Sequence, residues 1–83
     1  MTGRINIDFA ASEGAVLRMV GLVERRGFEV SGLAMAAQDG RGSLSLDVRA
    51  RDSGRSLEIV AGQLRRLVDV RNVSIQPHST GAL

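Results

Sequence analysis

Hydrophobic and polar residues alternate along the first segment of the chain. Ile5, Ile7 and Phe9 occupy every second position of residues 4–10, with polar side chains between them. Because successive side chains of a strand point to opposite faces of a sheet, this alternation predicts a half-buried strand.

The apolar spacing then changes to that of an amphipathic helix over residues 13–26. One face of this helix carries the following apolar residues: Val16, Met19, Val20 and Val23. We expect Ser12 to cap the helix and Gly27 to follow its last turn, because these residue types favour those positions.

Residues 28–38 predict a second strand whose alternation is interrupted. Phe28 and Val30 share one face, whereas Leu33 is in phase with the other face. We therefore expect a β-bulge at residues 31–32, where a serine and a glycine separate the two halves.

A turn signal at residues 39–42, Asp-Gly-Arg-Gly, follows this strand. Apolar residues then alternate again: Leu44, Leu46, Val48 and Ala50. The turn and the two flanking runs together predict a β-hairpin.

The rest of the chain predicts a second helix and a last strand. The helix carries one apolar face: Leu57, Val60, Ala61, Leu64, Leu67 and Val68. We expect Asp52 or Ser53 to cap it. The last strand is predicted over residues 70–76, and Pro77 is expected to end it because proline cannot donate to a strand ladder.

The element order is therefore β-α-β-β-α-β, and its two halves resemble each other. A shift of 41 positions superposes the first strand and helix on the third strand and second helix. This order predicts an α+β, ferredoxin-like fold, with two helices on one face of a four-stranded antiparallel sheet of strand order 4-1-3-2. We expect one domain over residues 1–77 and a flexible C-terminal tail over residues 78–83.

Composition narrows the function. The chain has 83 residues, of which 43% are hydrophobic, and no cysteine. His78 is its one histidine, which disfavours a catalytic triad and a multi-histidine metal site. We therefore expect no catalytic residue, no metal and no cofactor. No apolar run approaches the roughly 18 residues of a membrane span, so we expect a cytoplasmic protein without a membrane partner.

The basic residues leave open a second class of function, the binding of RNA or another anion. All eleven basic residues are arginines, and the chain has nine acidic residues, which gives a formal charge of +2. The pairs at 25–26 and 65–66 end the two predicted helices, where they complement the helix dipole or form a patch for RNA or another anion. RNA-recognition domains of this element order stack bases on strand aromatics. Residues 43–51 contain none, so a nucleic-acid partner is disfavoured.

An uncharged segment occupies the centre of the second strand, which the predicted topology places at a sheet edge. Its residues are apolar and mostly small: Leu33, Ala34, Met35 and Ala36. A bare edge promotes aggregation unless it is covered. We expect this edge to pair with the same strand of a second copy, forming a homodimer; the alternative is an edge protected only by its bulge and Asp39.

Gly14 lies in the turn between the first strand and the first helix. Glycine at a helix N-terminus lets a ligand approach the backbone, and the free N–H groups there bind carboxylates. The alternative is a tight turn without a ligand.

With these features, the chain resembles an ACT domain. More narrowly, it resembles the small regulatory subunits of acetolactate (acetohydroxyacid) synthase. Residues 14–30 are close to the family's pattern of a glycine, an apolar helix, and then Arg-Gly-aromatic. Residues 35–37 and 63–75 are similar to the short, isozyme II-like type.

The resemblance implies a non-catalytic subunit that binds and activates a thiamine-diphosphate-dependent large subunit. It also implies that the second strands pair edge to edge, and that many members bind a branched-chain amino acid at the first strand–helix turn. Carried onto this sequence, the effector residues are Ala11, Gly14 and Ala15.

Valine-responsive members usually have asparagine where this chain has Ala11. Loss of that amide predicts a weak or absent valine response. The alternative is a stand-alone ACT module that senses another small amino acid.

Overall fold

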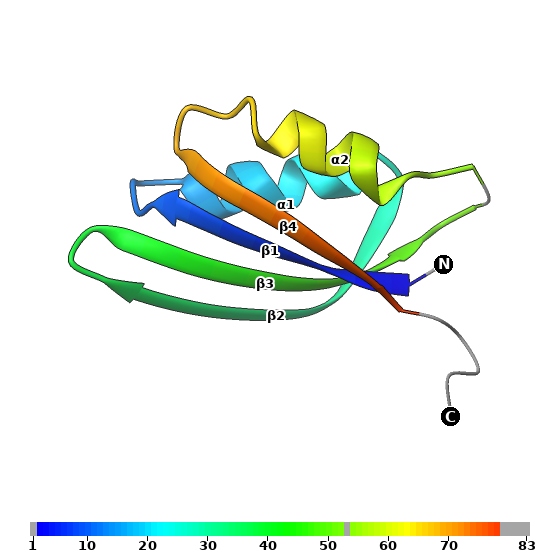
Figure 1. Ribbon diagram of the computed structural model, residues 1–83, viewed down its shortest axis with the longest axis horizontal. Coiled ribbons are helices and arrows are strands. Elements are labelled where there is room, and N and C mark those ends of the chain that lie inside the picture. The colour runs from blue at the N-terminus through cyan, green and yellow to red at the C-terminus, as the bar shows by residue number, and fades with distance from the viewer. Residues whose placement is uncertain (1, 53, 79–83) are drawn as a thin grey trace.

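The computed structural model describes residues 2–52 and 54–78. The elements follow the predicted order: β1 (Thr2–Ala10), α1 (Ala15–Arg25), β2 (Phe28–Gln38), β3 (Arg41–Ala50), α2 (Leu57–Leu64) and β4 (Val70–His78). The strands form one antiparallel sheet in the order β2-β3-β1-β4. Both helices cover the same face of this sheet (Figure 1). The predicted ferredoxin-like fold and strand order are confirmed.

The core lies between the helices and the sheet face that they cover. Its largest fully buried side chains are Phe9, Phe28, Ile5, Ile7, Met19, Leu44, Leu46, Leu64, Val23, Val48 and Val60. The alternating residues of β1 and β3 supply the sheet side, and the apolar helix faces supply the other side. The alternation in the sequence therefore identified the buried face correctly.

Gly42 shows how closely this core is packed. A Cβ atom at this position would lie 2.3 Å from the ring of Phe9, which is directly opposite across the β1–β3 ladder. Phe9 is only 1% exposed, so its ring has no free space to move into. Only glycine fits at this point.

The predicted bulge in β2 is confirmed. The β2–β3 register shifts between Val30 and Gly32, after which Leu33 faces Leu46. Because Leu46 is buried under the helices, the bulge returns Leu33 and Met35 to the helix side of the sheet. Both nevertheless remain about half exposed, at 52% and 49%.

Helix α1 begins later than the sequence predicted. Ser12 is not its cap: Gly14 occupies the N-cap position with φ 77°, and no side chain caps the helix. The amide of Ala15 instead bonds the Ser12 carbonyl at 3.1 Å, so a turn precedes the helix. The positive φ explains the glycine, because other residues rarely adopt this conformation.

The cap of α2 also differs from the prediction. Ser56 caps the helix, and its Oγ accepts a hydrogen bond from the Ile59 amide at 3.4 Å. Asp52 instead forms an ion pair with Arg55 at 3.0 Å. Ser53, the other predicted cap, lies outside the described residues.

Helix α2 ends at Leu64, earlier than expected. Leu67 is partly buried, but Val68, which was predicted on the core face, is 99% exposed. After Leu64 the amides of Arg66 and Leu67 bond carbonyls three residues back, at 3.1 Å and 3.0 Å, so the chain turns instead of continuing as an α-helix. The Asp69 carbonyl then accepts a hydrogen bond from the Ala10 amide at 2.7 Å, which places the start of β4 beside the end of β1.

Strand β4 does not stop before Pro77. It continues to His78, with Pro77 opposite Gly3 of β1. The expectation was wrong because β4 has a neighbour on one side only, and a proline without an N–H group is tolerated at such an edge. Residues 79–83 of the expected tail lie outside the described residues.

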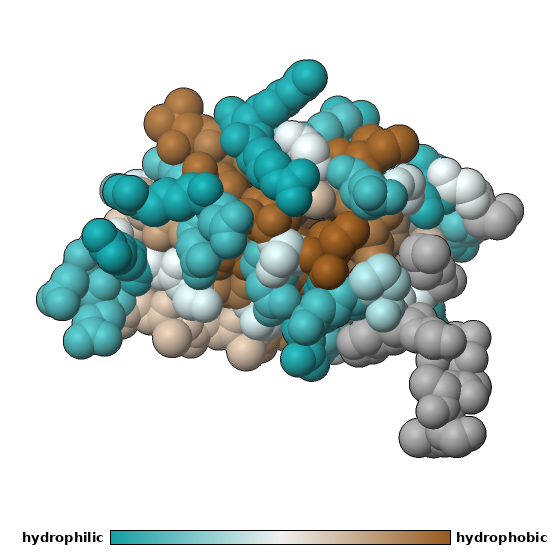
Figure 2. Space-filling view, viewed as in Figure 1, coloured by the Kyte–Doolittle hydropathy of each residue, from teal (hydrophilic) through white to brown (hydrophobic). Residues whose placement is uncertain are grey.

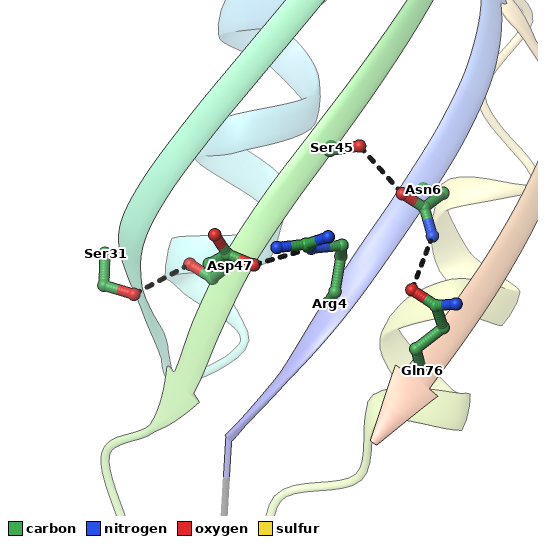
Figure 3. Close-up of polar contacts among 6 residues, drawn as sticks. All are labelled: Arg4, Asn6, Ser31, Ser45, Asp47 and Gln76. Carbon is green, nitrogen blue, oxygen red and sulfur yellow. Dashed lines mark hydrogen bonds and ion pairs between the residues drawn. The ribbon is translucent and has the colours of Figure 1, made fainter. Parts of the chain in front are cut away.

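The sheet face away from the helices is polar and makes contacts along its own surface (Figure 3). Arg4 Nε donates to Asp47 Oδ1 at 2.8 Å, and Ser31 Oγ donates to the Asp47 carbonyl at 3.2 Å. The hydrogen bond and the charge of Asp47 raise the pKa of Arg4 further above its already high value. Arg4 therefore remains a cation at any pH at which the protein is studied.

A second chain of contacts crosses the same face (Figure 3). Ser45 Oγ donates to Asn6 Oδ1 at 2.8 Å, and Asn6 Nδ2 donates to Gln76 Oε1 at 3.4 Å. Together the two sets of contacts join all four strands. This part of the face satisfies its polar side chains internally.

Candidate functional site

The first candidate site is the turn between β1 and α1. The structure leaves Ala11 and Gly14 exposed, whereas Ala15 is 2% exposed and belongs to the core. The Ala11 amide donates to the Gly40 carbonyl at 2.8 Å, and the Ala15 amide donates to Ser12. Two of the three predicted effector residues therefore have backbone donors that are already used.

The next two amides of α1 remain available. Within the described part of the chain, the N–H groups of Val16 and Leu17 have no hydrogen-bond acceptor. A carboxylate at this helix end would find these two donors and the positive end of the helix dipole. The methyl group of Ala11 adds no polar contact.

Arg18 organises this turn, and sequence reasoning missed it. Its guanidinium donates to the Glu13 carbonyl at 3.2 Å and to Ser12 Oγ at 3.3 Å, and forms an ion pair with Asp69. The side chain thus fastens the β1–α1 turn to the residue before β4. The partners are 51 positions apart in sequence, so no local pattern could have revealed the pair.

The second candidate site is the outer edge of β2. The structure brings the four predicted pairing residues to this edge, and all four are exposed: Leu33, Ala34, Met35 and Ala36. In Figure 2 the lower margin of the molecule, where Figure 1 places β2, is pale brown. This edge presents unpaired backbone groups beside uncharged side chains.

Residues 2–52 and 54–78 contain no group of three or more His, Cys, Asp or Glu side chains that could hold a metal ion. No polar or charged side chain among them is buried. A groove of about 1000 Å³ at the hairpin end of the sheet is open to solvent and includes Asp8, Arg41 and Asn72. No helix in the described part of the chain is long and apolar enough to cross a bilayer.

Comparison with protein families decides what this βαββαβ domain is. The family model for the ACT domain matches residues 11–73, most of the chain and both candidate sites. The chain belongs to the ACT-domain family.

Two relatives of this ACT domain are named as small subunits of acetolactate synthase. The isozyme 2 small subunit of Escherichia coli K12 is 29% identical over 80 residues, which are 96% of this chain and 91% of that protein. The probable small subunit of Methanothermobacter thermautotrophicus is 32% identical over 68 residues, which are 81% of this chain. The chain spans only 40% of the length of that archaeal relative.

A solved structure shares the fold of this ACT domain. The acetolactate synthase small subunit of Thermotoga maritima superposes with a TM-score of 0.73 at 21% identity, covering 90% of this chain and 47% of that one. The resemblance to ACT domains and to acetolactate synthase small subunits that the sequence indicated is thus confirmed.

Proposed function

We propose that this ACT domain is a non-catalytic, activating subunit of an acetolactate synthase in branched-chain amino acid biosynthesis. One observation carries the proposal: the match to the Escherichia coli isozyme 2 small subunit extends over nearly the full length of both chains. The partner is the large catalytic subunit, which uses thiamine diphosphate, and the complex is cytoplasmic.

Activation follows from binding. A subunit without chemistry of its own raises activity if it binds the active conformation of its partner more tightly than the inactive one. An ACT domain with an ordered sheet and two packed helices provides a fixed surface for such selection. Neither of its two aromatic residues is available for base stacking, since Phe9 and Phe28 are each 1% exposed. This supports a protein partner over RNA.

We infer further that two copies pair through β2. A two-fold axis perpendicular to the sheet makes the two β2 strands antiparallel and keeps all four helices on one face. Residues that lie directly opposite each other in an antiparallel pair have their side chains on the same face of the sheet. Two such residues must therefore be an even number of positions apart in sequence, which places one residue of each copy on the axis. With Ala34 on the axis, Leu33 of one copy faces Met35 of the other, and each half-exposed side chain covers another.

The effector response is proposed to be weak or absent. A valine carboxylate at the β1–α1 turn would have the amides of Val16 and Leu17, but no side-chain donor at Ala11. A missing polar partner in a buried ligand site costs about 1–3 kcal/mol. The turn therefore retains part of an effector site without the group that strengthens it.

The deciding experiment measures acetolactate production by the large subunit from the same organism, with and without this chain, at zero and saturating valine. We expect activation that valine does not reverse. Activation that valine abolishes would keep the activating role and overturn our interpretation of Ala11. No activation of a competent large subunit would contradict the proposed function and favour a free-standing amino-acid sensor.

One substitution tests the effector site directly. Ala11→Asn supplies a side-chain amide at the turn, and we expect valine to bind about 5-fold to 150-fold more tightly than to the parent chain, from the 1–3 kcal/mol of one added polar contact. Isothermal titration with valine measures the change, and Ala11→Leu, which adds bulk without an amide, is the matched control. Equal affinity of both variants would place the effector elsewhere.

A further inference from the structure

The turn between α2 and β4 exposes an apolar side chain on a well-bonded backbone. Val68 is 99% exposed, more than any other large hydrophobic residue in the described part of the chain. The backbone beside it is fixed by hydrogen bonds from Leu67 to Leu64 at 3.0 Å and from Val70 to Leu67 at 3.1 Å. The exposure of Val68 is therefore a feature of an ordered turn.

A second exposed apolar residue lies at the same end of the molecule. Leu17 is 78% exposed and precedes Arg18, as Val68 precedes Asp69. The Arg18–Asp69 ion pair therefore brings the neighbourhoods of Leu17 and Val68 together. Figure 1 shows the start of α1 and the α2–β4 turn at the same end, and Figure 2 shows an apolar cluster projecting at the position of that turn.

The charges around these residues are mostly positive. Near Leu17 and Val68 in the sequence there are three basic residues, Arg18, Arg65 and Arg66, and two acidic residues, Glu13 and Asp69. Within the described part of the chain, the Arg66 guanidinium has no hydrogen-bond or ion-pair partner. Arg66 and Val68 lie on the same short turn between α2 and β4, so an unpaired cation and an exposed apolar side chain are two positions apart. Such a surface complements an apolar pocket bordered by carboxylates.

Two other surfaces of the molecule are less suited to such a partner. The β2 edge is the one that we propose pairs with a second copy. On the open sheet face, many polar side chains already bond one another, as Figure 3 shows. A contact surface on an ordered backbone loses little conformational freedom on binding, so less of its interaction energy is spent on ordering. The ordered turn that carries Val68 meets this requirement.

We propose that Leu17, Val68 and Arg66 form the surface that docks on the large catalytic subunit, in a pocket that is apolar and bordered by carboxylates. This inference rests on the proposed function. Arg18 also holds the β1–α1 turn through Ser12 and Glu13. Arg18 therefore links the candidate effector turn to Asp69, the residue that follows Val68 of the docking surface.

The test compares Val68→Asp with Ile59→Asp in the activation assay with the large subunit. Ile59 is the control because it is also exposed, at 61%, but lies on the first turn of α2, away from Asp69. We expect Val68→Asp to raise the concentration for half-maximal activation at least tenfold, and Ile59→Asp to leave it unchanged. The mass of the dimer and the unfolding midpoint should not change in either variant.

Arg66→Glu is the second variant. We expect weaker activation and a smaller loss of activation with added salt, because an attractive charge pair has been removed. Unchanged activation by Val68→Asp, or equal loss in Ile59→Asp, would overturn the docking surface. A changed dimer mass in Val68→Asp would overturn it too, since the patch would then join two copies. Failure of the unsubstituted chain to activate would instead contradict the proposed function itself.

Discussion

The two edges of the sheet differ in how they are protected. Between Glu29 and Asp39, β2 contains no charged residue, and its side chains from Leu33 to Gln38 are all exposed. Strand β4 has a proline at position 77 and a register irregularity at Arg71.

Arg65 protects β4 further. Its guanidinium donates to the Val73 carbonyl at 2.9 Å, so a backbone acceptor of this edge strand already has a partner. Proline, bulges and charged side chains are the devices by which proteins prevent edge-to-edge association. The β2 edge has a bulge of its own between Val30 and Gly32, but its exposed segment from Leu33 to Gln38 has neither a charge nor a proline. The difference supports our proposal that β2 is the pairing edge.

Among the tests of this difference between the edges, we expect Met35→Asp on β2 to have the largest effect, the loss of the dimer. A carboxylate on the β2 edge would be buried without a partner in the paired sheet, and such burial is strongly unfavourable. We expect the mass in solution, measured by light scattering, to fall from two chains to one. Ser74→Asp, an exposed position on β4, is the matched control and should leave the mass unchanged. An unchanged mass for Met35→Asp would refute pairing through β2.

Stability and pairing can be separated with Gly42→Ala. The added Cβ meets the ring of Phe9, and overpacking of this kind costs about 1–3 kcal/mol. We expect the free energy of unfolding, measured in urea, to fall by that amount. The dimer should persist in the absence of urea, because Gly42 is buried on β3 and lies at neither edge. Loss of the dimer here would mean that reduced stability alone explains the effect of Met35→Asp.

We expect the smallest effect when the groups that protect the β4 edge from association are removed. Arg65→Ala removes one hydrogen bond to the strand, worth about 0.5–1.5 kcal/mol. Combined with Pro77→Val, it should also allow association at the second edge, which light scattering would detect as species larger than a dimer at high concentration. Arg66→Ala, a neighbouring arginine without a partner in the described part of the chain, controls for lost charge. Equal association of both variants would show that Arg65 does not protect the edge.

Much of this molecule was predictable from the sequence because the signals were local. Period-two alternation located β1 and β3, the broken phase located the β2 bulge, and Asp39-Gly40 gave the hairpin, whose two residues adopt φ of 53° and 77°. These features depend on a few neighbouring residues, so no knowledge of the tertiary structure was needed.

The errors arose where distant contacts decide the outcome. Helix α2 ends before Leu67 and Val68, and the chain then pairs with β1 through the hydrogen bond between Asp69 and Ala10, of which the helical spacing gave no sign. The role of Arg18 likewise depends on Asp69. The Ala11 and Gly14 turn was located correctly, but which amides remain available there depends on the hairpin carbonyl of Gly40.

Cysteine cross-linking tests the difference between the edges most directly, because the chain has no cysteine of its own. Directly opposite residues of antiparallel strands have Cα atoms about 4.5–5.5 Å apart, within the range that a disulfide spans. Under mild oxidation, Ala34→Cys should form a covalent dimer and Ser74→Cys should remain a single chain. A covalent dimer from Ser74→Cys, with Ala34→Cys remaining a single chain, would contradict the account and assign pairing to β4.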